Sequence, residues 1–416
     1  MRDMEKKHVV IIGGGFAGIY AARALARAAK DTLRITIINR TNHFLFTPML
    51  HEVATGSLGH HQVVESIREI IYGTNIHFIE GSVDSVALVS KNVHVGNVVV
   101  PYDYLVFAQG STSHFFHTKG AQEHAFVLKD LSDAISLRNK IIEMFEKASL
   151  EQNPTVRKQL LSFIIVGGGA TGVETAVEVA EFAQRTLAKY YASGCRDTKP
   201  TVTLIQSSEE LLPVFHASTR TRALKVLRKK GIAVRFSTRV KEVTPTYILV
   251  DKEEEIPAGV VVWTAGVKAN AIATTEAQLP VHESGRIHAH QNLLVENYTD
   301  VFALGDVAYI QINDGRIAPM LAQVAIAQAK VLSQNILRLA SGKPLKPFQY
   351  ASKGELISLG RWEAAGVIFG VPIYGKLAWF IWRTVYLFKF ISGSKRLRIA
   401  FDWTLQIFYP RDITRV

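Results

Sequence analysis

The chain has 416 residues, which is too long for one ordinary hydrophobic core and predicts two or three domains. Its 48% hydrophobic and 20% charged residues are typical of a globular protein and exclude a disordered or low-complexity chain. The 48 basic and 36 acidic residues give a net charge of +12, which predicts an anionic partner: nucleic acid, a membrane surface or a phosphorylated ligand.

The N-terminal part begins with an apolar strand, a glycine-rich turn and an alanine-rich helix. The strand covers residues 9–12, and the turn reads G-x-G-x-x-G, with its glycines at Gly13, Gly15 and Gly18. In such a turn the first glycine permits a tight bend, the second lets a pyrophosphate approach the backbone, and the third lets helix and strand pack closely. The sequence therefore predicts a dinucleotide site at this turn.

A second strand over residues 34–39 completes a βαβ unit. An acidic residue usually ends this strand and bonds the adenosine ribose, but the residue here is Asn39, which can bond the ribose only without charge. The segments that follow alternate like short antiparallel strands, at residues 76–79, 83–89, 92–95 and 98–100. A buried strand then leads to a glycine turn at Gly110 and closes the unit.

Residues 163–172 repeat the opening motif. The three motif glycines are Gly167, Gly169 and Gly172, and a helix follows over residues 173–182. The partner strand over residues 201–205 ends at Gln206, so the acidic ribose partner is missing again. A strand over residues 260–267 ends in a glycine turn like that at Gly110. Because two such turns do not arise by chance in one chain, the sequence predicts two dinucleotides, or one dinucleotide and a degenerate copy of its site.

The chain then returns to the first domain. Residues 297–306 contain a turn, a short apolar strand and a Gly-Asp pair, and a helix is expected over residues 319–339. A proline-containing linker over residues 343–347 separates that helix from a distinct tail. We predict an α/β fold with two Rossmann-like dinucleotide-binding domains, the first split in sequence, and a C-terminal membrane-associating helical tail.

The tail combines aromatic and basic residues. A helix over residues 376–391 would be about 24 Å long, which is short of the roughly 30 Å hydrocarbon core of a bilayer. Six basic and no acidic residues lie between Lys376 and Phe401. This composition favours a helix lying at an anionic lipid surface; an aromatic dimer or domain interface is the alternative. Nucleic acid is disfavoured, because the chain has no groove-reading motif.

The only cysteine is Cys195, so an internal disulfide cannot form, and no Cys/His spacing indicates a metal site. A reducing compartment is therefore expected. The charged segment over residues 1–7 leads at once into the first strand, and we expect no secretory signal there.

Several stretches resemble the two-dinucleotide-binding-domain flavoproteins, and more narrowly the type II NADH:quinone oxidoreductases, over essentially the whole chain. They are the Phe44-Leu45-Phe46-Thr47-Pro48 loop, residues 53–56, the Gly-Val-Glu at 172–174, residues 301–306, residues 322–328, and Ala378-Trp379 in the tail. Disulfide and sulfide:quinone reductases look similar but need paired cysteines, which this chain lacks.

The resemblance implies FAD at the first turn and NADH or NADPH at the second. The implied FAD-contacting residues are Gly13, Gly15, Phe16, Ala17, Gly18, Asn39, Arg40, Ala108, Gly110, Gly305, Asp306, Ala322, Gln323 and Val324. The implied coenzyme-contacting residues are Gly167, Gly169, Thr171, Gly172, Gln206, Ala265 and Gly266. These assignments imply an FAD-binding domain at 1–126 and 285–342, an NAD(P)H-binding domain at 127–284, and a membrane-anchoring region at 343–416.

The implied reaction passes a hydride from NAD(P)H to FAD and two electrons to a membrane quinone, without proton pumping. The resemblance gives Glu174 a role in nucleotide contact or proton relay, and places Gln323 and Gln328 at the quinone. The family usually has two glutamines in succession, and Ala327 here replaces the first. Without an acid at Gln206 to repel a 2′-phosphate, we expect either coenzyme to be used.

The family resemblance also implies a peripheral membrane protein facing a reducing, cytoplasmic-type compartment, at a cell inner membrane, with a homodimer left open. Two other functions remain open at this point. One is an NAD(P)H-dependent reductase of a soluble ferredoxin- or rubredoxin-type acceptor. The other is a non-catalytic, nucleotide-bound signalling protein.

Overall fold

The structure is a computed structural model that describes residues 6–29, 32–191, 195, 198–312, 315–352, 354–405 and 411–415. The chain packs into two compact units, each assembled from three segments. The first unit comprises Met1–Leu45, Val64–Thr112 and Val267–Ala351. The second unit comprises Phe46–Val63, Ser113–Gly266 and Ser352–Val416.

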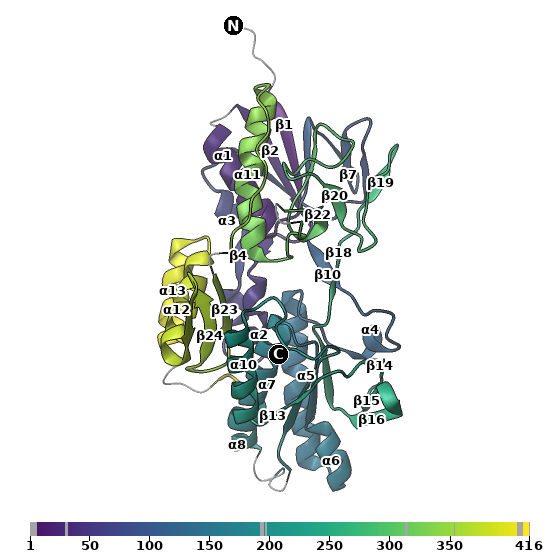
Figure 1. Cartoon of the computed structure of the whole chain (residues 1–416), viewed down its shortest axis with the longest axis vertical. Helices are drawn as coiled ribbons and strands as arrows, with labels where there is room; N and C mark the ends of the chain where they lie inside the picture. The colour runs from purple at the N-terminus through teal and green to yellow at the C-terminus, as the bar shows by residue number, and fades with distance from the viewer. Residues whose placement is uncertain are drawn as a thin grey trace. The chain divides into compact units, whose positions relative to one another are not determined.

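The first unit is built on a parallel five-stranded sheet with the strand order β21-β9-β1-β2-β5, of which β1 and β2 are labelled in Figure 1. Strand β1 (Lys7–Ile12) pairs in parallel with both β2 (Leu33–Asn39) and β9 (Tyr104–Phe107). Helix α1 (Phe16–Ala29) packs side by side with α11 (Ala322–Ala340). Strand β21 (Val301–Ala303) joins the sheet beside β9, so the late segment does return to the first unit, as expected.

One prediction for this unit was wrong. Residues 76–79 were expected in a run of antiparallel strands, but β5 (Ile76–Glu80) pairs in parallel with β2 and forms the edge of the main sheet. The alternating pattern arises because an edge strand has partly uncovered faces, just as an antiparallel strand does. Antiparallel pairing holds for β6 (Ser85–Ala87), β7 (Asn92–Val95) and β8 (Val98–Pro101).

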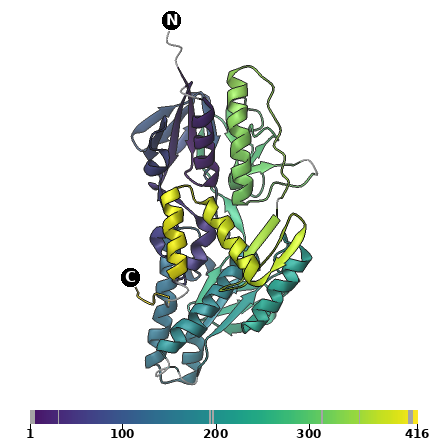
Figure 2. The ribbon, with the colours of Figure 1, turned by 90° about the vertical axis from the view of Figure 1, so that its left-hand side faces the viewer.

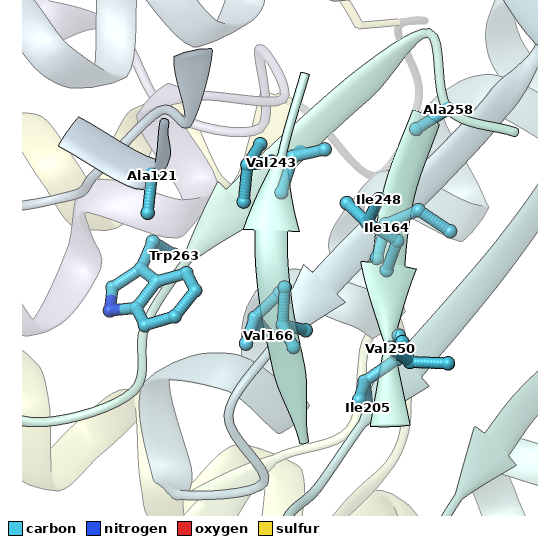
Figure 3. Packing of buried hydrophobic residues seen from close by; sticks show 11 residues of the cluster. Ala121, Ile164, Val166, Ile205, Val243, Ile248, Val250, Ala258 and Trp263 are labelled. Atoms are coloured by element: carbon cyan, nitrogen blue, oxygen red, sulfur yellow. The ribbon is translucent and has the colours of Figure 1, made fainter. Parts of the chain in front are cut away.

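The second unit repeats the arrangement in a four-stranded parallel sheet. Its strands are, in order, β13 (Ile232–Arg235), β12 (Thr201–Ile205), β11 and β17 (Val260–Trp263). Helix α7 (Ala170–Glu181) follows β11 (Ser162–Val166) and continues directly into a π-helical segment, η3 (Phe182–Leu187). Figure 3 shows part of the core, in which Ile164 and Val166 of β11 pack with Ile248, Val250 and their neighbours. These apolar contacts hold the sheet against the antiparallel strands β14 (Val240–Val243), β15 (Tyr247–Val250) and β16 (Glu254–Pro257).

The tail belongs to the second unit and begins with a three-stranded antiparallel sheet that the sequence analysis did not predict. Its strands are β23 (Gly354–Ser358), β24 (Ala364–Ile368) and β25 (Val371–Tyr374). Figure 2 shows this sheet and the two helices after it, α12 (Gly375–Lys389) and α13 (Gly393–Leu405), in yellow tones. Among the described residues, none of the helices is both long enough and apolar enough to cross a bilayer.

The remaining elements of the first unit are β3 (His43–Leu45), β4 (Val64–Ser66), α3 (Ile67–Ile71), β18 (Val267–Ala269), β19 (Ala273–Thr275), β20 (Ile287–Ala289), η5 (Gly305–Val307) and β22 (Ala308–Ile310). Strand β10 (Ser111–Ser113) lies at the border between units in the sequence. The remaining elements of the second unit are η1 (Thr47–Met49), α2 (Leu50–Val53), η2 (His60–Gln62), α4 (Ala121–His124), α5 (Leu131–Leu150), α6 (Pro154–Leu160), α8 (Ala188–Tyr190), α10 (Ala217–Lys229) and η4 (Asp251–Glu253).

Candidate active site

The two glycine turns have the same backbone geometry, one in each unit. Gly13 has φ 114° and Gly167 has φ 113°, a region that side chains other than hydrogen rarely allow. The N–H of Gly13 donates to the carbonyl of Ile38 at 2.8 Å, and the N–H of Gly167 donates to the carbonyl of Ile205 at 2.8 Å. Each turn is therefore pinned to the end of the neighbouring strand in the same way.

The third glycine of each motif lets the helix sit directly on the turn. A Cβ at Gly18 would lie 1.8 Å from the carbonyl oxygen of Gly13, and a Cβ at Gly172 would lie 1.8 Å from that of Gly167. By contrast, a Cβ at Gly15 or at Gly169 would meet no atom within 4 Å. The middle glycine thus faces open space at the start of a helix, where a side chain would hinder the approach of a phosphate group.

The start of α7 is suited to an anion. Its N-cap residue is Gly169, which has no side chain to accept a hydrogen bond from the first N–H groups of the helix. Those N–H groups, aligned with the helix dipole, form a ready site for a pyrophosphate. This geometry fits a dinucleotide at the second turn, and the open space before α1 at Gly15 fits one at the first.

The two amide residues at the strand ends fasten the turns. Asn39 Oδ1 accepts from the N–H of Gly14 at 2.8 Å, and Gln206 Oε1 accepts from the N–H of Gly168 at 2.7 Å. The side-chain nitrogens donate to the following loops: Asn39 Nδ2 to the carbonyl of Thr41 at 2.9 Å, and Gln206 Nε2 to Ser208 Oγ at 2.5 Å. The ribose contacts of both residues stay predictions; the structure adds a role in shaping the turn.

The remaining residues predicted at the FAD lie in the first unit. Asp306 Oδ2 accepts from Ser111 Oγ at 2.7 Å, and Gln328 Oε1 accepts from the N–H of Gly305 at 2.7 Å. Gln328 is buried and so supports the Gly-Asp turn from α11. Gln323 Nε2 donates to the Tyr350 hydroxyl at 2.6 Å.

Three further features complete the first-unit set. Ala322, Gln323 and Val324 form the first turn of α11, whose N-cap Leu321 makes no side-chain cap. Phe16 and Ala17 are buried at the start of α1, and Arg40 follows β2 at the surface. Ala108 follows β9, and its N–H donates to the carbonyl of Ile12 at 2.9 Å, while Gly110 has φ 71°.

In the second unit, the turn after β17 lies next to the glycine motif. The N–H of Thr264 donates to the carbonyl of Val166 at 2.8 Å, and Trp263 Nε1 donates to the carbonyl of Ala265 at 2.9 Å. Gly266 adopts φ 74° directly after Ala265, and Thr171 lies in the first turn of α7. The residues predicted at the coenzyme therefore gather at the carboxyl ends of β11, β12 and β17, where parallel sheets bind ligands.

Glu174 lies on α7 within a buried cluster of charged groups. Its Oε1 accepts from the N–H of Ser358 at 3.1 Å. Burial is the main cause that raises the pKa of Glu174 to about 8; the Ser358 N–H opposes this rise, and the neighbouring Glu52 and Glu178 carboxylates add to it. Burial likewise raises the pKa of Glu52 to about 7 and lowers that of His51 to about 4. Glu174 can therefore hold a proton at neutral pH.

Residues 7–329 match the pyridine nucleotide-disulphide oxidoreductase family. The type II NADH:quinone oxidoreductase Ndh of Mycobacterium tuberculosis is 32% identical to this chain, over 98% of the chain and 89% of that protein. The type II NADH:quinone oxidoreductase of Haemophilus influenzae is 30% identical, over 91% and 92%. The chain belongs to the type II NADH:quinone oxidoreductases.

The fold agrees with this family. The structure of NDH2 from Plasmodium falciparum, solved in complex with NADH, matches with a TM-score of 0.89 and 19% identity, covering 99% of this chain and 100% of that one. The glycine turns and the segments around them were sufficient to recognise the family from the sequence. Three further residues were not predicted: Glu52 and Glu178, whose charges raise the pKa of Glu174, and Arg411, which pairs with Glu178. The spacing of three glutamates along α7 was the available signal, because positions 174, 178 and 181 share one helix face.

Proposed function

We propose that the chain carries out the reaction for which its family is named, oxidising NADH with FAD and reducing a quinone. The observation that carries the proposal is the duplicated glycine turn, with open space before the helix in each unit. The turn of the first unit would hold FAD and that of the second the nicotinamide coenzyme, within the domain limits predicted above. The comparisons do not favour reduction of a soluble ferredoxin-type protein or a non-catalytic role.

When bound, FAD would accept the hydride and pass the electrons to quinone, while the protein binds and orients the cofactor and its substrates and delivers protons. Gly15 and Gly169 would leave room for the pyrophosphates of the two dinucleotides, and Asp306 would form a hydrogen bond with the flavin half of FAD. The overall reaction converts NADH, one proton and quinone to NAD⁺ and quinol, so one proton must enter. We assign the delivery of that proton to Glu174, the buried carboxyl that holds a proton at neutral pH.

An anaerobic titration tests the reaction. The purified protein should be yellow, its flavin absorbance should bleach on addition of NADH, and a short-chain quinone should restore it. Bleaching without restoration by quinone, but with restoration by a ferredoxin, would support the soluble-acceptor alternative. Absence of flavin after reconstitution with FAD would contradict the assignment of the first turn.

The tail is our candidate for the lipid-facing surface. It exposes a set of large apolar side chains, and its sequence is rich in basic residues; the exposed apolar residues are Phe369, Val371, Leu377, Phe380, Phe388, Leu397 and Phe401. Clustered exposed apolar residues of this kind mark an interaction surface, and a net positive segment favours anionic lipid. We therefore propose peripheral attachment to an anionic membrane through α12 and α13, which would bring the enzyme to its quinone.

Flotation with vesicles tests this attachment without deleting the tail, which carries the N–H that bonds Glu174. A Leu377→Asp/Phe388→Asp double variant should lose binding to vesicles of phosphatidylcholine and phosphatidylglycerol, yet keep NADH-dependent bleaching of its flavin. Leu150→Asp is a matched control, because Leu150 is 79% exposed on α5 and lies outside the tail. Equal binding of all three proteins would assign the apolar patch to another partner.

A further inference from the structure

Helix α7 carries three carboxylates on one buried face. Glu174, Glu178 and Glu181 are spaced by four and three residues, which places them above one another along the helix. All three are buried, whereas the buried face of a helix is normally apolar. Buried carboxylates must be paired, hydrogen-bonded or protonated, so their partners decide the charge of each.

The three carboxylates have fewer cationic partners the closer they lie to the N-terminus of the helix. Glu181 contacts two cations, Lys230 at 2.5 Å and Arg411 at 3.1 Å. Glu178 contacts Arg411 at 2.9 Å and accepts from Ser57 Oγ at 2.8 Å and Thr55 Oγ1 at 3.1 Å. For Glu174, the described residues supply only the backbone N–H of Ser358.

Arg411 comes from the last described segment of the chain and bridges two of these glutamates. Its neighbour Asp412 pairs with Arg138 of α5 at 2.6 Å, which ties this chain end to the second unit independently of the glutamates. Arg411 is 18% exposed, and the two carboxylates that it contacts are 7% and 6% exposed. A charge pair so shielded from water is strongly coupled, and its loss leaves an uncompensated buried anion.

We propose that Arg411 is a positioning residue for proton delivery: by holding Glu178 as an anion one helical turn from Glu174, it keeps the proton on Glu174. The proposal rests on the proton role proposed above for Glu174. Arg411 itself need not touch quinone, flavin or coenzyme, because it acts through the charge of Glu178.

The direction of the effect follows from the surrounding charges. Burial raises the pKa of Glu178, but Arg411, His51, Ser57 and Thr55 outweigh it and hold that pKa below its usual value. Ionised Glu178 in turn raises the pKa of Glu174. The other titratable or charged groups facing this pair are His51 and Glu52 from α2, and Arg383 and Tyr386 from α12. Glu52 raises the pKa of Glu174 as well, so Glu178 is one of two anionic neighbours.

The test is the pH dependence of a single half-reaction. Enzyme reduced with one equivalent of NADH is mixed with a short-chain quinone in a stopped-flow instrument, and the rate of flavin reoxidation is followed from pH 6 to pH 9.5. In Arg411→Met, Glu178 should take up a proton, Glu174 should lose one of its two anionic neighbours, and the alkaline limb should move to lower pH. We expect a rate reduced at least about threefold at pH 8 and little changed at pH 6.

Three further variants separate charge from structure. Arg411→Lys should restore the wild-type pH profile, and Glu178→Gln should reproduce the profile of Arg411→Met with Arg411 intact. Arg138→Gln loosens the same chain end without touching α7 and should leave the profile unchanged. The rate of flavin reduction by NADH should not change in any of them. If Arg411→Met does not fold, Glu178→Gln and Arg411→Lys still decide the question.

The Glu174→Gln variant separates the proton role of Glu174 from the positioning role of Arg411. If this variant keeps the wild-type alkaline limb, Glu174 is not the proton source and the proposed function of that residue fails. If Glu174→Gln removes the limb while Arg411→Met and Glu178→Gln leave it in place or move it to higher pH, only the role of Arg411 is overturned. An equal shift in Arg138→Gln would also overturn it, because chain anchoring rather than charge would then be responsible.

Discussion

Replacing Glu174 with glutamine should stabilise the protein at alkaline pH. The folded-state pKa of Glu174 is raised by burial to about 8 from 4.5, so the folded protein keeps this carboxyl neutral while the unfolded chain ionises it. The stability contributed by this group is therefore fully present below about pH 4.5 and is lost as the pH rises through about 8. Glutamine has no proton to lose and can still accept the N–H of Ser358, so it avoids the loss.

The magnitude follows from the two pKa values. Each tenfold difference in proton affinity is worth about 1.4 kcal/mol, so the difference between 4.5 and about 8 corresponds to at most about 5 kcal/mol between acidic and alkaline solution. For domains of 150–250 residues, each kcal/mol shifts the melting temperature by about 2–4 °C. Between pH 5 and pH 9 about 4 kcal/mol of this difference is expressed, so the melting temperature of Glu174→Gln relative to wild type should rise by roughly 8–15 °C.

Differential scanning calorimetry of the FAD-loaded protein over this pH range is the assay. Glu209→Gln serves as the control, because Glu209 is exposed in a loop of the same unit. A difference between Glu174→Gln and wild type that stays constant from pH 5 to pH 9 would refute the reasoning, since it would mean that Glu174 is ionised throughout.

Three other predictions concern the glycine turns and the coenzyme. Gly169→Ala should raise KM for NADH at least about tenfold without lowering the melting temperature, as steady-state kinetics and calorimetry would show. Gly172→Ala should instead destabilise the fold by a few kcal/mol, because its Cβ would overlap the carbonyl of the turn. Gly15→Ala should fold but purify with less FAD, which absorbance spectra report, and a full complement of flavin would argue against pyrophosphate contact there. The wild-type enzyme should use both NADH and NADPH, and strong rejection of NADPH would contradict this expectation. Gln206→Glu should lower kcat/KM for NADPH about tenfold or more relative to NADH, because the new carboxylate repels a 2′-phosphate.

Local backbone requirements made the two nucleotide-binding turns predictable. Gly13 and Gly167 adopt a φ that favours glycine, and Gly18 and Gly172 touch backbone that leaves no room for a side chain. Constraints of this kind leave a direct trace in the sequence. The strands beside the turns could be placed because buried parallel strands are continuous apolar runs.

Features that depend on distant partners could not be predicted. Asn39 was expected at a ribose, and its bond to Gly14 requires the strand and the turn to be brought together by the sheet. The parallel pairing of β5 depends on which strand it meets, which alternation does not encode. Arg411 is more than two hundred residues from Glu178, so its contact with that carboxylate follows from the tertiary fold alone.

The helix face that carries Glu174, Glu178 and Glu181 ends where α7 continues into the π-helical segment. A π turn accommodates one additional residue and sets back the side chains beyond it by about 100° relative to a continuous α-helix. In a continuous α-helix, Arg185 would follow Glu181 on the same face, but it is exposed instead. Because of this change of helical phase, Glu178 and Glu181 pair with cations from elsewhere in the chain. A one-residue deletion within Phe182–Leu187 would bring Arg185 into competition with Arg411 for them.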